Sequence, residues 1–360
     1  MTVDVEDIAA RLARWVATQP PLAETPLDPA TEALCRRKLT AWTAPGALAA
    51  KLACELPAPW EPLGRLLLVI SEHDVVGTIA GVVAGLLTGN QVRVKARATA
   101  PLIRSLVASL ALPPASCEVL DWHSGNQDDA AVLAGVDGVL IAGDNATLRH
   151  YRMAAEPGVR LIELGHRVGI AAVAGPVACE GELELLAAAL RHDATVFGGA
   201  VCSTPQWVLV EQADVADRLY AALCAGLALL PPLPLRERWP NLVRARELAL
   251  LSRLGAPVAV ECEPANGWGV TLGSQLDPAR RLPRGIALLV GPLPGQFEAL
   301  ARVHRHQRQT LGTWGPVPEA PGYTHRCAIG RMHERAPGTP HDGFFELAAL
   351  VRFTSREDAA

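Results

Sequence analysis

The chain has 360 residues, of which 50% are hydrophobic and 19% are charged, and its net charge is −4. A chain of this length and composition can bury more than one hydrophobic core, which excludes a disordered tail and predicts two domains. The negative net charge and the scattered basic residues argue against nucleic acid as a partner. The most apolar run, residues 75–87, is shorter than the roughly 18 residues of a membrane span, so none is expected.

The eight cysteines lie far apart in the sequence and form no C-x-x-C pair. Neither a zinc site nor a compact disulfide framework is therefore predicted, and no metal is expected. The N-terminus also lacks a charged segment followed by an apolar one, the pattern that marks a chain for export. We therefore expect a cytoplasmic protein with reduced thiols.

Residues 1–60 have helical spacing interrupted by prolines. From residue 65, short apolar strands alternate with helices, which indicates a parallel sheet covered on both faces and a doubly wound α/β domain. The strands are predicted at 65–70, 91–95, 117–122, 137–143 and 159–164, and the helices at 75–87, 100–112, 128–135 and 145–153.

A second α/β region is predicted from Val168 onward. Its expected strands are 169–175, 256–262 and 285–291, and its expected helices are 180–191 and 213–230. The run "PPLPLRERWP" (231–240) is predicted to be a stiff proline-rich connection. The chain is thus expected to divide into four parts, residues 1–60, 61–167, 168–315 and 316–360.

Cys202 follows "FGGAV" and precedes an apolar strand, which predicts a tight loop that feeds the strand. A thiol on such a loop can stand among backbone N–H groups that favour the thiolate and later an oxyanion. The alternative is a small buried side chain that only contributes to packing.

Other polar groups follow predicted strands. Glu163 is either solvated or a proton-transfer group in a pocket, and His166 is either a proton shuttle or a turn residue. Lys95 ends a strand where ligands of open α/β sheets bind, or it is simply exposed. No G-x-G-x-x-G follows the first strand, so the common dinucleotide fingerprint is absent. "PHDG" places His341 and Asp342 on one turn.

These segments together resemble the aldehyde dehydrogenase superfamily. "GLLTGNQVRVKARATAPL" is similar to its pattern of a glycine-asparagine turn, a strand that ends in lysine, and a helix. "LIELGHR" resembles its glutamate-leucine-glycine-glycine-lysine motif, with His166 in place of the second glycine. Cys202 lies 39 residues after Glu163, close to the superfamily's spacing.

More specifically, the chain is similar to the bacterial long-chain acyl-CoA reductase family, the reductase component of luminescence fatty acid reductase. That family has an aspartate nine residues before the cysteine, as Asp193 is here, and a serine-proline-glutamine run after it, close to "STPQ". Its C-terminal pattern is matched by "IGRMHERAPGTPHDG". The resemblance covers residue 60 to the end and implies an aldehyde-dehydrogenase-like fold, with a nicotinamide-cofactor-binding domain (61–167), a catalytic cysteine domain (168–315) and a C-terminal segment that packs back on the body.

The implied activity is the NADPH-dependent reduction of an acyl thioester to an aldehyde. Cys202 would attack the thioester, expel the thiol and hold a thioacyl enzyme, which a hydride from the nicotinamide would reduce. The donor is acyl-CoA or an acyl carrier protein, and a homodimer is compatible with the resemblance. Two alternatives are oxidation of an aldehyde to an acid, with Glu163 activating water, and a catalytically silent homologue that acts as a binding partner.

The resemblance also assigns roles to individual residues. Catalytic roles are expected for Cys202, Glu163, His166 and Asp74, cofactor contacts for Ser71, Lys95, Arg97, Gly143, Asp144 and Gly165, and substrate contacts for His341 and Asp342.

Two positions refine these roles. NAD-preferring relatives have a glutamate three residues after the lysine, where this chain has Ala98. Arg97 adds positive charge for a 2′-phosphate, which favours NADPH.

Asp74 stands where the superfamily has an asparagine that donates to the oxyanion. Either Asp74 is protonated, or His73 donates, or the backbone N–H of Cys202 acts mostly alone.

Overall fold

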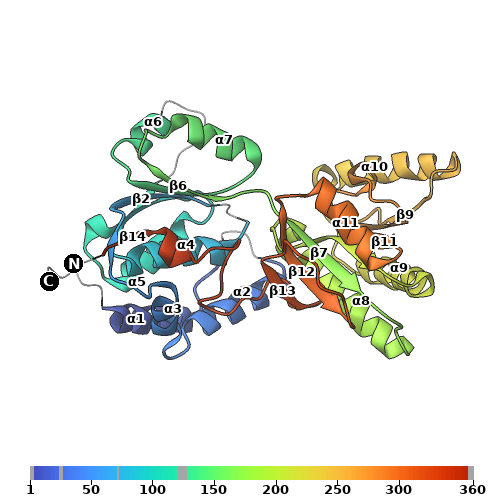
Figure 1. Ribbon diagram of the computed structural model, residues 1–360, viewed down its shortest axis with the longest axis horizontal. Coiled ribbons are helices and arrows are strands. Elements are labelled where there is room, and N and C mark those ends of the chain that lie inside the picture. Colours follow the sequence, from blue (N-terminus) through green and yellow to red (C-terminus); the bar gives the residue numbers. More distant parts are fainter. Residues whose placement is uncertain (1–3, 24–26, 71–72, 121–127, 356–360) are drawn as a thin grey trace. The chain divides into compact units, whose positions relative to one another are not determined.

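The computed structural model describes residues 4–23, 27–70, 73–120 and 128–355 (Figure 1). The chain forms two compact units: unit 1 comprises residues 1–166 and 335–360, and unit 2 comprises residues 167–334. Each unit is built around its own sheet, in which most or all of the strand pairs are parallel. The predicted α/β fold with parallel sheets is confirmed.

Unit 1 contains a five-stranded parallel sheet in the order β4-β3-β2-β5-β6. β2, the earliest of these strands, has β3 and then β4 on one side and β5 and then β6 on the other, so the order of the strands reverses between β2 and β5. In doubly wound sheets, ligands bind beyond the carboxyl ends of the strands at such a switch point. The strands are β2 (Arg65–Val69), β3 (Gln91–Lys95), β4 (Cys117–Leu120), β5 (Gly138–Ala142) and β6 (Arg160–Leu164).

Helices of two groups belong to unit 1. The N-terminal helices are α1 (Val5–Ala17), α2 (Pro29–Trp42) and α3 (Ala47–Glu55), and the helices between the strands are α4 (Val75–Leu87), α5 (Ala100–Leu110), α6 (Asp128–Leu133) and α7 (Asn145–Ala154). The apolar run predicted as a helix over 75–87 is α4, in which 11 of 13 residues are buried. A Cβ at Gly85 would lie 2.6 Å from the Val92 side chain, so glycine lets α4 approach β3 closely.

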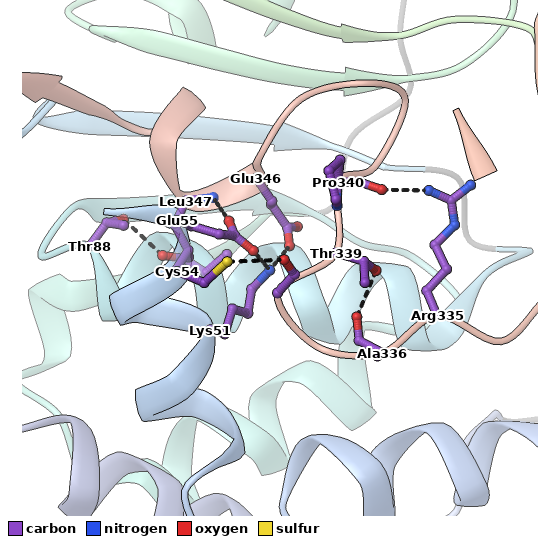
Figure 2. A network of polar contacts seen from close by, with 12 residues as sticks. Lys51, Cys54, Glu55, Thr88, Arg335, Ala336, Thr339, Pro340, Glu346 and Leu347 are labelled. Carbon is purple, nitrogen blue, oxygen red and sulfur yellow. Dashed lines mark hydrogen bonds and ion pairs between the residues drawn. The ribbon is translucent and has the colours of Figure 1, made fainter. Parts of the chain in front are cut away.

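The C-terminal segment of unit 1 is fastened to α3 by a buried polar network (Figure 2). The Lys51 ammonium contacts Glu55 at 2.5 Å and Glu346 at 3.3 Å. The second oxygen of Glu55 accepts the backbone N–H of Leu347 at 2.7 Å, at the start of α12 (Glu346–Ala349). Beyond α12, β14 (Val351–Phe353) pairs antiparallel with β1 (Trp60–Pro62), so the chain end closes onto the segment that precedes β2.

Unit 2 contains a seven-stranded sheet in the order β13-β12-β7-β8-β11-β10-β9, parallel except for the β10–β9 pair. Side chains of β7 alternate between the two cores: Ala171 and Val173 enter one core, and Ile170 and Ala172 enter the other. The strands are β7 (Val168–Val173), β8 (Pro205–Val210), β9 (Val258–Cys262), β10 (Gly269–Gly273), β11 (Gly285–Val290), β12 (Arg308–Trp314) and β13 (His325–Ala328).

The main helices of unit 2 are α8 (Glu180–Thr195), α9 (Ala213–Ala228), α10 (Leu235–Arg253) and α11 (Leu293–Val303). The prediction of a stiff connection over 231–240 is wrong beyond Pro234, where α10 begins and continues through Pro240. Pro240 is exposed, so water can reach the carbonyl that loses its helical donor, and the helix tolerates the ring.

In the part of the chain that the structure describes, no helix combines the length and the hydrophobicity of a membrane-crossing segment. Within the same ranges, no group of three or more histidine, cysteine, aspartate or glutamate side chains is arranged to hold a metal ion.

Candidate active site

The carboxyl edge of the unit 1 sheet aligns predicted site residues from different strands. Lys95 on β3 pairs with Val69 on β2, Val69 pairs with Ile141 on β5, and Ile141 pairs with Glu163 on β6. Lys95 and Glu163 thus lie at the same level of the sheet, three strand spacings or about 14 Å apart along it. Both flank the switch point between β2 and β5.

Two aspartates at this edge cap the helices that leave the switch point. Asp74 caps α4 by accepting the backbone N–H of Gly77 at 2.9 Å. Asp144 caps α7 by accepting the N–H of Thr147 at 2.8 Å. Hydrogen bonding to Thr147 lowers the pKa of the Asp144 carboxyl, and the charge of His166 makes a smaller contribution in the same direction. Both carboxylates are therefore used as N-caps, the position where a negative charge is favoured by the helix dipole.

A basic turn follows β3. Lys95 is half-buried at the end of the strand and Arg97 is exposed two residues later. The N–H of Ala100 donates to the carbonyl of Arg97 at 3.1 Å, which folds the turn back into α5. The sequence of this turn, residues 95–100, contains two basic residues and no carboxylate.

Glu163 is engaged by a residue that the sequence did not single out. Both of its carboxylate oxygens accept hydrogen bonds from the guanidinium of Arg152 on α7. This paired geometry raises the pKa of Arg152. The carboxylate therefore lies neither in an apolar pocket nor free in water, the two settings that the sequence left open. His166, three residues later, is exposed.

The turn that carries His341 and Asp342 belongs to unit 1. Asp342 has a φ of 53° and Gly343 a φ of 87°, and His341 and Phe344 close the turn by two backbone hydrogen bonds. Burial lowers the pKa of His341, and nearby Arg335 lowers it further. Arg335 also donates to the carbonyl of Pro340 at 2.9 Å, as Figure 2 shows beside the Lys51 network.

In unit 2, Cys202 lies on a loop between the end of α8 and β8. Phe197, Gly198 and Gly199 precede it with φ values of 55°, 61° and 73°. A left-handed conformation at a bulky residue such as Phe197 is strained, and such strain persists only where neighbouring structure holds it. The Phe197 ring packs edge-on against His333, with ring centroids 5.9 Å apart.

The neighbouring structure that holds this loop is centred on Asp193. Its side chain, on the last turn of α8, is fully buried. The carboxylate accepts the backbone N–H groups of Gly330 at 2.5 Å and Met332 at 3.3 Å. Burial raises the pKa of Asp193 to about 7 although these bonds act in the opposite direction.

His333 connects the same centre to the residue after Cys202. Its Nε2 lies 2.7 Å from the backbone oxygen of Asp193, and its Nδ1 lies 2.7 Å from the Ser203 hydroxyl. A carbonyl oxygen can only accept, so Nε2 donates to Asp193, and the second ring nitrogen, Nδ1, is left to bond the Ser203 hydroxyl. One imidazole therefore joins α8 to the Cys202 loop.

Four other cysteines are poor nucleophiles. Burial raises the pKa of Cys35 and Cys117 to about 12, and that of Cys224 and Cys262 to about 11. Because the thiolate is the reactive form, these thiols are inert near neutral pH.

The structure thus places the predicted residues in three regions. The carboxyl edge of unit 1 holds Lys95, Arg97, Gly143, Asp144, Glu163, Gly165, His166 and Asp74. His341 and Asp342 lie on a separate turn of unit 1, and Cys202 lies in unit 2 on the loop next to Ser203, which the Asp193 network reaches through His333. Ser71 lies outside the described residues. Sequence reasoning missed Arg152, Ser203 and His333. For His333 the signal was present in "IGRMH", but nothing in the sequence joins this motif to Asp193.

Comparison with solved structures identifies the fold class as that of the aldehyde dehydrogenases. The aldehyde dehydrogenase AldC of Pseudomonas syringae, solved as a variant with NAD+ and octanal, is 13% identical with a TM-score of 0.74, over 97% of this chain and 83% of that one. Glyceraldehyde-3-phosphate dehydrogenase GapN of Methanocaldococcus jannaschii, solved with NADP, is 12% identical with a TM-score of 0.71, over 98% and 89%.

A longer relative has the same fold. Proline utilization A of Bradyrhizobium japonicum is 18% identical with a TM-score of 0.68, and the match covers 97% of this chain but only 42% of that protein. The bifunctional proline utilization A protein of another solved structure is likewise matched over 42% of its length. No curated protein sequence matches the chain significantly.

The sequence pattern of the acyl-CoA reductase (LuxC) family matches residues 58–353. The chain belongs to this family, as the sequence motifs predicted, and so to a group of aldehyde-related oxidoreductases.

Proposed function

We propose that the protein reduces an acyl thioester to an aldehyde with NADPH, through a thioacyl intermediate on Cys202. The observation that carries the proposal is the buried network of Asp193, His333 and Ser203, which fixes the loop of Cys202 in a chain of the acyl-CoA reductase family. A strained loop braced from two sides is typical of a site that must hold a reacting atom in place.

The carboxyl edge of unit 1 fits a nicotinamide dinucleotide, which supplies a hydride when bound. The helix N-termini at Asp74 and Asp144 flank the switch point, where a pyrophosphate binds in doubly wound folds. Lys95 ends β3 and Arg97 follows it, at the position where the adenosine ribose binds in this fold, and the sequence from 95 to 100 contains no carboxylate that could accept a 2′-hydroxyl. This charge supports NADP(H) over NAD(H). The NADP and NAD+ of the GapN and AldC structures agree with a nicotinamide cofactor.

The residues of the chain then account for the acyl chemistry. The Cys202 thiolate attacks the thioester carbonyl, and the C–S bond to the donor breaks, which releases the donor thiolate to take a proton from solvent. After hydride addition to the thioacyl carbon, the bond to Cys202 breaks, which frees the aldehyde and restores the thiolate. The balance is one thioester, one NADPH and one proton consumed for one aldehyde, one thiol and one NADP+.

Oxyanion stabilisation is assigned to the backbone N–H of Cys202 rather than to Asp74. The carboxylate of Asp74 already accepts the Gly77 N–H as the cap of α4, and an ionised carboxylate would repel an oxyanion. Its role in this proposal is to fix the start of α4 beside the switch point.

The geometry supports reduction over oxidation of an aldehyde. Oxidation needs a base that activates water to hydrolyse the thioacyl enzyme, and Glu163 is the candidate. Both oxygens of Glu163 accept hydrogen bonds from Arg152, so activating a water there first requires breaking that pair. We therefore expect the thioacyl enzyme to be reduced by the hydride and not hydrolysed by water.

The test combines two measurements on the whole protein. NADPH oxidation is followed with a series of acyl-CoAs, and intact-protein mass spectrometry detects an acyl adduct in the absence of NADPH. Cys202→Ala should lose both signals, whereas Cys224→Ala, which removes a half-buried thiol whose pKa is raised to about 11, should keep them. Acid formation from an aldehyde and NADP+, without thioester-dependent NADPH oxidation, would contradict the proposal.

A further inference from the structure

Helix α10 presents an exposed face on which basic and apolar side chains alternate. Residues three and four apart lie on the same side of a helix. Here that spacing joins Arg236, Trp239, Val243, Arg246, Leu250 and Arg253, all exposed, with Leu235 and Leu254 at the ends. Trp239, Leu250 and Leu254 are 57%, 58% and 76% exposed, far more than large apolar side chains on a packed face. We call these eight residues the outer face of α10.

The opposite face fixes how α10 is oriented. Asn241 is 1% exposed and donates to the carbonyl of Gly267 at 2.6 Å, while its side-chain oxygen accepts the N–H of Arg284 at 2.8 Å. Leu248 is fully buried on the same side. The outer face is therefore held toward solvent by buried polar contacts and is not the result of a loosely attached helix.

The charge of the outer face is positive because the acidic residues of α10 are already paired. Glu247 binds Arg244 at 2.6 Å, and Glu237 binds Arg284 at 3.4 Å. Among the residues that the structure describes, no carboxylate forms an ion pair with Arg236, Arg246 or Arg253. Three cations thus remain available beside the exposed apolar side chains.

The attachment of α10 is continuous with the loop of Cys202. Gly267, which Asn241 holds, precedes the buried Trp268. The Trp268 ring packs against Gly199, where a Cβ would lie 3.0 Å from a ring atom, and Gly199 is three residues before Cys202. The outer face and the nucleophile loop are therefore parts of one packed structure within unit 2.

We infer that the outer face of α10 docks an acidic acyl carrier protein that delivers the thioester to Cys202. Tryptophan and arginine dominate binding energy in protein interfaces, and a convex helix face suits a macromolecule, whereas a small thioester needs a concave pocket. The unpaired arginines select a partner with an acidic surface and accelerate its association. This inference rests on the proposed function, because the carrier is one of the two thioester donors compatible with it.

The experiment compares two donors of the same acyl chain on the full-length protein. NADPH oxidation is measured with tetradecanoyl-carrier protein and with tetradecanoyl-CoA, for Arg246→Glu and Trp239→Ala. The matched control is Arg302→Glu, which reverses an exposed arginine on α11 of the same unit. Arg246→Glu and Trp239→Ala should each raise the KM for the carrier substrate about tenfold and leave kcat and the acyl-CoA kinetics unchanged. Arg246→Glu, which reverses a charge, should also weaken the salt dependence of the carrier reaction. Arg302→Glu should change neither substrate.

Direct binding separates failure of docking from failure of the proposed function. Fluorescence anisotropy of a labelled holo carrier should report binding to the wild type and its loss in Arg246→Glu, even if neither thioester is reduced. Unchanged carrier KM and unchanged carrier binding in both variants would overturn the inference. Absence of carrier binding together with wild-type binding to phosphatidylglycerol vesicles, lost in Arg246→Glu, would overturn it as well and assign the outer face to a membrane surface.

Discussion

The buried carboxylate of Asp193 accepts the backbone N–H of Gly330 at 2.5 Å, which ties the end of α8 to a turn 137 residues later in the chain. The same turn continues to His333, whose ring reaches Ser203 beside Cys202. Asp193 therefore links two distant segments whose common neighbour is the candidate nucleophile. Its position nine residues before Cys202 has a physical reason, because α8 must end close to the loop that it braces.

Replacing Asp193 with alanine should destabilise unit 2. The N–H groups of Gly330 and Met332 would lose their acceptor, and a buried unsatisfied donor costs about 1–3 kcal/mol. Asp193→Asn retains one acceptor oxygen and should lose about half as much. Urea unfolding, with hydrogen exchange at residues 329–333, measures both changes. The exposed Asp217→Ala serves as the control, and equal stability of all three variants would contradict the prediction.

The contribution of Asp193 should depend on pH in a defined direction. Burial raises its pKa from 3.8 to about 7, so the folded state holds a proton that the unfolded state releases between these values. The stabilisation is complete below pH 4 and is lost as the pH rises through 7. Asp193→Asn has no such proton, so its stability relative to the wild type should improve from pH 5 to pH 8. Parallel stability profiles for the two proteins would show that Asp193 does not titrate in this range.

The strands and the fold class were predictable because short runs with valine, leucine or isoleucine alternate with helical segments along unit 1, the pattern of a parallel sheet covered by helices. The connection predicted over 231–240 failed for a physical reason. Proline is unfavourable inside a helix, but Pro240 is exposed, so water can reach the carbonyl that loses its helical donor. Asn241, next to it, holds α10 by a hydrogen bond to Gly267, and helix propensity takes no account of such tertiary contacts.

The candidate site was predictable where it follows the sheet. Lys95 ends a strand, Gly143 directly follows one and Glu163 is the last residue but one of another, and parallel register brings such positions to one edge. The partners of these groups were not predictable, because the residues of the Arg152–Glu163 pair and of the His333–Ser203 contact are not separated by a helical or strand repeat. Such contacts depend on how the elements pack in three dimensions, which cannot be read from one sequence.

Reversing the charge at Arg97 should alter the choice of cofactor. Arg97→Glu would place a carboxylate on the turn after β3, where it repels a 2′-phosphate and can accept a 2′-hydroxyl. We expect the KM for NADPH to rise at least about tenfold and the KM for NADH to fall. The matched control is Arg104→Glu on the exposed side of α5, which should leave both values unchanged. A similar rise in KM for both cofactors in Arg97→Glu would instead indicate a general loss of binding.

Breaking the Lys51–Glu55 pair should cost far more than breaking a surface pair of the same spacing. Both side chains are almost fully buried, and Lys51→Met would leave the Glu55 carboxylate without its cation, at a cost of about 3–5 kcal/mol. The double variant Lys51→Met, Glu55→Gln removes that unpaired charge and still accepts the Leu347 N–H, so it should be more stable than Lys51→Met alone.

The control is the pair of Glu32 and Arg36, which has the same i,i+4 spacing on α2 but is 43% and 30% exposed. Arg36→Met should change the free energy of unfolding by less than about 1 kcal/mol. Hydrogen exchange of residues 341–350 provides a local measurement, because loss of the buried pair should loosen the C-terminal segment that carries His341. Equal effects of Lys51→Met and Arg36→Met would show that the network in Figure 2 does not fasten this segment.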